Sequence, residues 1–216
     1  MENNPLNNLF NDKEFVEKIQ NLLPQLFEIA EIESSRAGKT GMEVGNLRER
    51  ILVSMFIHKF GTENVKTEIP TTEPEVDVIV FDEELSIKTI TNKYFTGVKL
   101  SWTVDYQKAV EFIESYEPLC SLFLVQINWE FEGGLFYVPV NIQNNVLEKL
   151  GKENYFKLPK QGTNPRGVEI TKEALEMLIK DKSSKTIPIF WEKRNLNYNP
   201  YKRWLDYWSE GINEIK

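Results

Sequence analysis

An aspartate and a lysine on two neighbouring predicted strands are the residues of this chain best suited to chemistry. Asp77 lies at the start of an apolar run, residues 76–81, and Lys88 lies within a second run, residues 85–91. A short acidic turn joins the two runs, so the strands are expected to lie side by side. A carboxylate and a lysine brought together in this way could bind a divalent metal and activate a water molecule.

Alternating helices and strands are predicted around this pair. Apolar residues at helical spacing predict helices over residues 12–34, 43–60, 105–116, 141–150, 172–180 and 198–212. Apolar runs bounded by turn residues predict strands at 65–69, 76–81, 85–91, 97–102, 119–128, 134–140 and 186–191. Pro24 lies inside the first helix and predicts a kink or a division into two pieces. The order indicates an α/β fold, with a central mixed β-sheet flanked by helices.

Composition indicates one domain inside a cell. The chain has 216 residues, 41% of them hydrophobic, which is enough for a substantial core, so residues 1–216 are expected to form one domain. Within it, about 151–216 would add loops and a C-terminal helix. There is no apolar stretch long enough to cross a membrane and no secretory signal. Cys120 is the one cysteine and lies in an apolar run, so no disulfide can form within the chain, which fits a reducing cytoplasm.

Charge is distributed unevenly along the chain. The net charge of −7 argues weakly against binding to nucleic acid, because DNA affinity depends on cations that neutralise phosphates. Residues 151–216, however, hold 13 Lys and Arg against 9 Asp and Glu, a net charge of +4. The preceding residues hold 13 against 24, a net charge of −11. This asymmetry is compatible with one basic face and with carboxylates gathered at a metal site.

The order of these features resembles the core motif of the PD-(D/E)XK nuclease superfamily, and of type II restriction endonucleases within it. In that pattern an aspartate begins one strand, and an acidic-x-lysine tripeptide lies on the next. Ser86-Ile87-Lys88 fits the tripeptide, with serine in place of the acid. The family's upstream helix usually supplies a glutamate, for which Glu43 or Glu49 is available, and its downstream helix often bears a polar pair, here Gln107-Lys108. The resemblance covers roughly residues 36–140.

Two shorter segments are similar to a narrower group. Gly41-Met42-Glu43 and residues 99–105 are similar to segments of a small family of enzymes that cut CGCG sites to blunt ends. The basic loop that holds Arg36 and Lys39 precedes the first of these segments, as it does in several small restriction enzymes.

The resemblance implies Mg²⁺-assisted hydrolysis of a phosphodiester. Asp77 would ligate the metal through a carboxylate oxygen, and the backbone carbonyl of Ile87 would be a second ligand. Ser86 is a weak Mg²⁺ ligand and could instead hold a water molecule beside the metal. Lys88 would orient or deprotonate the attacking water and offset charge in the transition state.

The missing acid at Ser86 makes a second carboxylate necessary. Glu49 is our choice, because at helical spacing it projects with Leu52 and Phe56 from a partly buried face. Glu43 and Glu84 remain alternatives.

Residues that would bind DNA are expected in two loops and on later elements. The predicted contacts are Arg36, Lys39, Met42, Lys99, Gln107, Lys160, Gln161 and Arg166. Met42 stands where a core methionine would be unusual, and apolar side chains can act as wedges between base pairs, so we expect it to contact or intercalate DNA. The polar loop at 160–166 carries side chains suited to base edges and phosphates.

Each of these residues also has an ordinary structural explanation. A carboxylate and a lysine on neighbouring strands most often form a solvated ion pair. Glutamates near the start of the second helix could pair with Arg48 and Arg50, and Met42 could fill a gap in the core. His58 is the one histidine of the chain and Cys120 the one cysteine. A zinc site, or a Ser/His or Cys/His catalytic pair, is therefore not expected. The aromatic C-terminal segment is more often a packed helix than a platform for bases.

The sequence therefore predicts a Mg²⁺-dependent, sequence-specific endonuclease for double-stranded DNA. It would act as a homodimer, because a two-fold protein places one site on each strand of a palindrome. A cognate methyltransferase would be its functional partner, without physical contact. One alternative is a non-catalytic DNA-binding module on a nuclease-like fold, which Ser86 favours. The other is a repair or recombination nuclease of the same superfamily.

Overall fold

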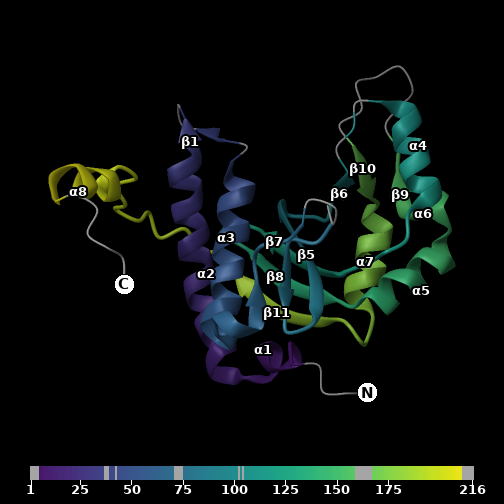
Figure 1. Ribbon diagram of the computed structural model, residues 1–216, viewed down its shortest axis with the longest axis horizontal. Coiled ribbons are helices and arrows are strands. Elements are labelled where there is room, and N and C mark those ends of the chain that lie inside the picture. Colours follow the sequence, from purple (N-terminus) through teal and green to yellow (C-terminus); the bar gives the residue numbers. More distant parts are fainter. Residues whose placement is uncertain are drawn as a thin grey trace.

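A six-stranded mixed sheet forms the centre of the protein (Figure 1). The computed structural model describes residues 5–36, 39–41, 43–70, 75–101, 103, 105–158 and 167–210. The strand order is β11-β8-β7-β5-β4-β3. These strands are β3 (Val65–Lys66), β4 (Val78–Val80), β5 (Glu83–Thr91), β7 (Ser121–Ile127), β8 (Glu132–Val138) and β11 (Lys185–Phe190). β5 and β7 run parallel, and the other neighbouring pairs are antiparallel. The predicted α/β class, a mixed sheet flanked by helices, is confirmed.

Helices cover both faces of this sheet (Figure 1). One face packs against α1 (Asn7–Asn11), α2 (Lys13–Ser34) and α3 (Val44–Phe60). The other packs against α4 (Tyr106–Ser115), α5 (Val140–Leu150), α6 (Lys152–Tyr155) and α7 (Lys172–Lys180). Side-chain alternation along β7 separates the two cores: Phe123 and Val125 belong to the first, and Leu122 and Leu124 to the second. All four are buried, as expected for a central strand covered on both faces.

Smaller elements extend from this centre. A three-stranded sheet of order β6-β10-β9 lies beside the second core, and a two-stranded hairpin, β1-β2, joins α2 to α3. A single 3₁₀ turn (Thr62–Asn64) precedes β3. The small strands are β1 (Ser35–Arg36), β2 (Lys39–Thr40), β6 (Val98–Ser101), β9 (Phe156–Lys157) and β10 (Val168–Ile170). The last helix, α8 (Lys202–Glu210), stands apart from the sheet, beyond α2 (Figure 1).

Several helix boundaries follow from their capping residues. Asp12, Asp105 and Thr171 each accept a hydrogen bond from a backbone N–H in the first turn of α2, α4 and α7. Gly61 ends α3 with a positive φ of 86°, a conformation that glycine adopts without strain. Of the two outcomes predicted at Pro24, the division into two pieces is excluded, because α2 is one helix through that position. Pro24 is buried within α2, so packing holds the helix together.

Two other local predictions need correction. Residues 35–41 were expected to be a loop, but they include the paired strands β1 and β2. Glu132-Gly133-Gly134 resembles a turn between the strands predicted at 119–128 and 134–140, whereas these residues begin β8. This position of the strand requires glycine because the backbone there is crowded: a Cβ atom would clash with the carbonyl oxygen of Gln126. This glycine reflects close packing and not a turn.

In the part of the chain that the structure describes, no helix combines the length and the apolar character needed to cross a membrane.

Candidate active site

The pairing of β4 with β5 places Asp77 beside Lys88. Val78 is opposite Leu85 in the antiparallel register, and the backbone N–H of Asp77 donates to the carbonyl of Leu85 at 2.9 Å. Asp77 thus extends the pairing by one residue beyond β4, so its side chain lies against the middle of β5. The short strand and the long strand together fix the position of this carboxylate.

The Asp77 carboxylate makes three contacts through one oxygen. Its Oδ2 atom accepts hydrogen bonds from the backbone N–H of Ile87 at 2.6 Å and from Nζ of Lys88 at 3.1 Å. The hydroxyl of Ser86 donates to the same atom at 3.5 Å, the limit of a hydrogen bond. The side chains of Asp77 and Lys88 are only 20% and 24% exposed, so water screens this pair less than an ordinary surface ion pair.

Glu49 brings a second carboxylate to this pair from α3. Burial raises the pKa of the Glu49 carboxyl above its usual value, and the negative charge of Asp77 raises it further. The positive charges of Lys88 and Arg50 oppose this rise. Glu49 and Lys88 also line the same cleft, which is described below. The structure thus places a carboxylate of the preceding helix beside the pair, and its role as a metal ligand stays a prediction.

The two alternative carboxylates are oriented differently. Glu43 is exposed at the start of α3, and its Oε1 atom lies 3.7 Å from Nε of Arg36. Glu84 is exposed near the start of β5. Of the three glutamates considered, Glu49 is the one that is half-buried beside Asp77 and Lys88.

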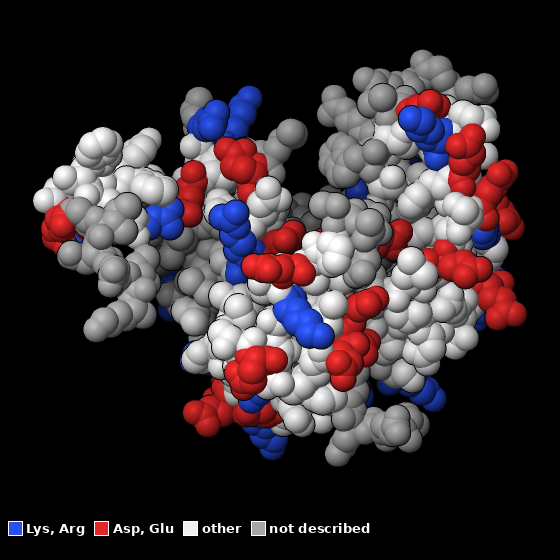
Figure 2. Space-filling model, viewed as in Figure 1, with Lys and Arg blue, Asp and Glu red and all other residues white. Residues whose placement is uncertain are grey.

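A cleft of about 450 Å³ opens beside these residues. Its walls come from the first turns of α3, from β5, and from β6 and β10 of the small sheet. The lining residues are Gly45, Asn46, Glu49, Ile87, Lys88, Thr89, Ile90, Gly97, Val98, Lys99 and Glu169. Figure 2 shows the molecule hollowed between the arm that contains α2 and α3 and the arm that contains β6, β9, β10 and α4. Catalytic candidates therefore lie on one side of the cleft, with a lysine and a glutamate from the small sheet on the other.

The donor set fits a hard divalent cation that keeps some of its own water. Among the described residues, no group of three or more His, Cys, Asp or Glu forms a complete metal site. Mg²⁺ is usually held by one or two carboxylates together with water and substrate phosphates, so a complete protein cage is not required. Asp77, Glu49 and the carbonyl of Ile87 would supply oxygen ligands of this kind. The negative charge of Asp77 raises the pKa of Glu49, because the two carboxylates repel each other. A cation bound between them would relieve this repulsion.

Sequence reasoning missed three polar residues at or near the site. Asn46 and Glu169 line the cleft. Burial raises the pKa of Glu75, and the charge of Lys88 opposes this rise, which puts Glu75 within electrostatic range of Lys88. The spacing of Asn46 and Glu49 on one helical face could have revealed Asn46. Glu169 could not be found in this way, because it reaches the cleft through the pairing of β10 with β6.

The predicted DNA contacts fall in several places. Arg36 and Lys39 are opposite each other in the β1-β2 hairpin and are exposed. Lys99 lines the cleft. Gln107 is exposed on α4, where its amide lies 3.4 Å from Glu111, and it does not line the cleft.

The remaining predicted contacts, Met42, Lys160, Gln161 and Arg166, lie outside the described residues.

The single cysteine and histidine have the ordinary structural roles expected of them. Burial raises the pKa of the Cys120 thiol to about 12, so it is not a thiolate nucleophile at neutral pH. His58 is exposed on α3, with its Nε2 atom 2.6 Å from Nζ of Lys18.

Comparisons with known proteins agree with this geometry. A model of the family described as "Restriction endonuclease ThaI" matches residues 9–210. A solved structure described as "Restriction endonuclease in complex with substrate DNA" is 53% identical in sequence and superposes with a TM-score of 0.89. The match covers 96% of this chain and all of that one. Among curated protein sequences, no match is found. These findings support the resemblance to type II PD-(D/E)XK enzymes, and the chain therefore belongs to the ThaI restriction endonuclease family and is a sequence-specific DNA endonuclease.

Proposed function

We propose that the enzyme hydrolyses both strands of a short DNA palindrome with Mg²⁺, using Asp77, Glu49, Ile87, Ser86 and Lys88. The observation that carries this proposal is the contact between Asp77 and Lys88 at 3.1 Å, with Glu49 in electrostatic range of both. Family membership favours this reading over a binding module that has lost its activity.

The two oxygens of Asp77 have separate roles in this proposal. Ser86, Ile87 and Lys88 all donate to Oδ2, which fixes the orientation of the carboxylate. The Oδ1 atom would face the metal, with Glu49 and the Ile87 carbonyl as further ligands. Bound there, Mg²⁺ would polarise the scissile phosphate and lower the pKa of a water molecule.

Lys88 would act on the charge that develops during hydrolysis. Its ammonium group is held by Asp77 and lines the cleft, so it can donate to the attacking water or to a phosphate oxygen. Ser86 is buried and can orient a water molecule through its hydroxyl.

We propose CGCG as the recognition sequence, from the similarity of residues 41–43 and 99–105 to the enzymes that cut it. Lys99 would contact the DNA from the side of the cleft opposite Lys88. Arg36 and Lys39 would contact phosphates from the exposed hairpin, with Gln107 and the residues of the 160–166 loop as further contacts and Met42 as a wedge.

We also propose a homodimer in which each copy cleaves one strand. A two-fold dimer needs a self-complementary contact. The exposed aromatic face of α8, where Trp208 is 90% exposed, is suited to such a contact. Residues 1–216 would form a single nuclease domain that works in the cytoplasm, where a methyltransferase of the same specificity would protect the host DNA. The single, reduced cysteine fits that compartment.

A digest of one plasmid tests the activity and the specificity together. The plasmid carries a known number of CGCG sites, and a second preparation carries the same sites methylated. With Mg²⁺, the wild-type enzyme is expected to give discrete fragments from the first preparation and none from the second. Discrete fragments with other ends would overturn the CGCG assignment only, whereas a smear would indicate a repair nuclease and intact plasmid a binding module. Asp77→Asn is the inactive control, and its full activity would overturn the proposed site.

A further inference from the structure

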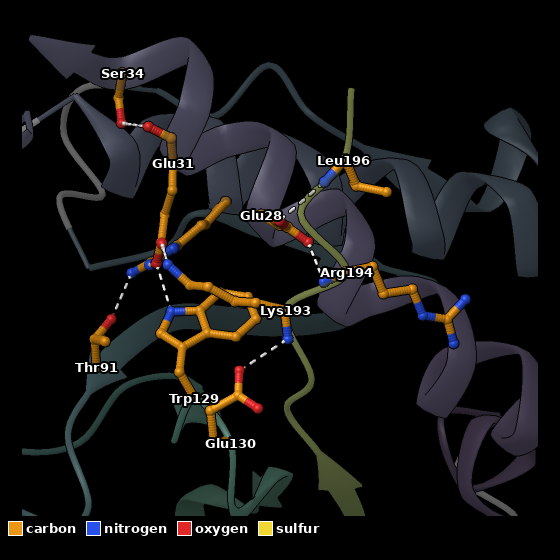
Figure 3. Close-up of polar contacts among 10 residues, drawn as sticks. Glu28, Glu31, Ser34, Thr91, Trp129, Glu130, Lys193, Arg194 and Leu196 are labelled. Carbon is orange, nitrogen blue, oxygen red and sulfur yellow. Dashed lines mark hydrogen bonds and ion pairs between the residues drawn. The ribbon is translucent and has the colours of Figure 1, made fainter. Parts of the chain in front are cut away.

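A mostly buried glutamate on α2, Glu31, is the centre of a polar network behind the candidate site (Figure 3). Glu31 accepts hydrogen bonds from Nη2 of Arg48 at 2.7 Å, from Nε1 of Trp129 at 2.8 Å and from Nζ of Lys193 at 2.9 Å. The side chains of Glu31 and Arg48 are only 12% and 6% exposed. Hydrogen bonds between charged groups that are shielded from water are directional and strong. They therefore fix the relative positions of the helices and strands that bear these groups.

Arg48 connects the helix that bears Glu49 to the strand that bears Lys88. It lies on α3 and donates through Nη1 to the hydroxyl of Thr91 at 2.9 Å, while its Nη2 atom reaches Glu31. Thr91 is the last residue of β5, three residues beyond Lys88. The planar guanidinium holds both partners at a fixed angle, which a more flexible side chain would not do. Arg48 thus sets the distance between α3 and β5 at the end of β5 nearest the cleft residues.

Arg48 and Glu49 are adjacent in α3, so the hydrogen bonds of Arg48 also affect the orientation of Glu49. Successive residues of a helix point about 100° apart, so the direction of one side chain fixes that of the next. Arg48 points into the network between α2 and β5, and Glu49 then faces the cleft. Rotation of α3 that released Arg48 would also turn Glu49 away from Asp77.

A segment from the end of the chain closes the network. We call residues 193–198 the strap. The backbone N–H groups of Arg194 and Leu196 donate to the Glu28 carboxylate at 2.9 and 3.3 Å, and Lys193 reaches Glu31 over the ring of Trp129 (Figure 3). The strap therefore covers α2 beside the Glu31–Arg48 pair.

We infer that Arg48 and Glu31 are positioning residues that hold Glu49 in its catalytic orientation, and that Lys193 of the strap supports them. This inference rests on the proposed function, because it assumes that Glu49 serves the reaction. Neither residue needs to touch DNA: Arg48 acts through α3, and Glu31 acts through Arg48. The pair therefore contributes to the rate of hydrolysis and not to the affinity for DNA.

Arg48→Lys is the main test, with Phe56→Leu as the matched control. Lysine keeps the charge but cannot hold Glu31 and Thr91 at once. Phe56 is buried on the same helix, against Phe123, so its truncation weakens the packing of α3 without altering the network. Both variants are assayed at a temperature where circular dichroism shows them folded, and their melting temperatures are compared.

The kinetic constants separate positioning from stability. We expect Arg48→Lys to lower kcat by about 10²-fold, the effect of displacing a reacting group by roughly 1 Å, with KM for DNA nearly unchanged. Phe56→Leu should lower the melting temperature with little effect on kcat. Equal loss of kcat in the two variants, or a wild-type kcat in Arg48→Lys, would overturn the inference.

Metal binding supplies a readout that does not depend on turnover. Calorimetric titration of the protein–DNA complex with Ca²⁺ should show weaker binding for Arg48→Lys than for Phe56→Leu, because a misplaced Glu49 is a poorer ligand. Equal Ca²⁺ affinities would contradict the inference.

Two further variants keep the test decisive. Lys193→Ala removes one contact from a side chain that is 41% exposed, so it is expected to fold and to lower kcat by less than Arg48→Lys. If Arg48→Lys does not fold, Lys193→Ala decides the question, and an unchanged kcat there overturns the role of the network. Glu49→Gln is assayed in parallel. Wild-type cleavage by Glu49→Gln would refute the proposed site itself, whereas loss there with normal Arg48→Lys would refute the positioning role alone.

Discussion

Oδ2 of Asp77 lies 3.1 Å from Nζ of Lys88 and 2.6 Å from the backbone nitrogen of Ile87. The same oxygen atom therefore binds both the Lys88 side chain and the backbone of β5, the strand that carries Lys88. An ion pair between two exposed side chains would be free to separate, but this one is anchored on one side by a main-chain hydrogen bond. That anchoring favours a pre-organised site over a solvated surface pair.

Substitution of either member of this pair should strongly slow cleavage while leaving DNA binding intact. We expect Lys88→Ala and Asp77→Asn to lower kcat by about 10²–10³-fold or more, as found when a group that stabilises developing charge is lost. Single-turnover cleavage and a filter-binding assay with Ca²⁺ would measure the two effects. Lys66→Ala, an exposed lysine on β3, is the control and should cleave normally. A Lys88→Ala enzyme as fast as the parent would exclude Lys88 from catalysis.

The three candidate glutamates should differ sharply in their effects. Glu49→Gln is expected to lose at least about 10²-fold in kcat, because it removes a charged metal ligand next to Asp77. Glu43→Gln and Glu84→Gln should retain nearly full activity, since both side chains are exposed and Glu43 is directed to Arg36. The same cleavage assay across a range of Mg²⁺ concentrations distinguishes them. If Glu43→Gln or Glu84→Gln proved the most damaging, the metal site would have to be reassigned.

Lys99 should contribute to binding through charge. We expect Lys99→Ala to weaken binding of cognate and unrelated DNA alike and to reduce the slope of log K against log salt by about 0.9, the value for one phosphate contact. Fluorescence anisotropy at several salt concentrations would measure this slope. Lys182→Ala, which alters an exposed lysine two residues beyond α7, is the matched control. An unchanged slope in Lys99→Ala would show that Lys99 does not contact a phosphate.

The exposed face of α8 should be required for the dimer. We expect the double change Trp204→Ser and Trp208→Ser to convert a dimer into a monomer without lowering the melting temperature of the monomer, because these rings are 53% and 90% exposed. Light scattering coupled to size-exclusion chromatography would give the mass. Leu119→Ser, which alters another residue with 70% exposure, should leave the dimer intact. A dimeric double variant would place the interface elsewhere.

Asp12 should make the stability of α2 depend on pH. The hydrogen bond from Lys59, then that from the backbone of Phe15, lower the pKa of Asp12 below its usual value of 3.8. A carboxyl whose pKa is lower in the folded state stabilises the protein above its unfolded pKa, and this contribution is lost as the pH falls through the folded pKa. The wild type should therefore melt at a higher temperature than Asp12→Asn near neutral pH, with the difference vanishing in acid. A difference that stays constant down to acid pH would contradict this assignment.

Local patterns were enough to predict the elements around the site. The helices predicted at 105–116 and 172–180 and the apolar runs of β5 and β7 depend on neighbouring residues in the sequence, and the structure confirms them. The position of Asp77 beside Lys88 also follows from two adjacent strands, whose pairing is local.

Features that depend on distant packing were predicted poorly. Gly133 is a residue type typical of turns, but it lies in β8. Glycine is needed there because Gln126 and Trp191, which comes 58 residues later in the chain, leave no room for a side chain. Glu169 reaches the cleft only through the pairing of β10 with β6, and no periodicity in the sequence indicates that pairing. The choice among Glu43, Glu49 and Glu84 likewise needed the burial of Glu49 against the sheet. Contacts between segments far apart in sequence decide all three.

The strap has a consequence for the order in which the enzyme matures during synthesis. A ribosome completes Glu49, Asp77 and Lys88 well before it reaches Lys193. A growing or truncated chain that ends before the strap would contain every proposed catalytic residue, yet it would lack the contacts that the strap makes with Glu28 and Glu31. For an enzyme that cuts DNA, full activity would then appear only after residues 193–198 have been made and have packed against α2.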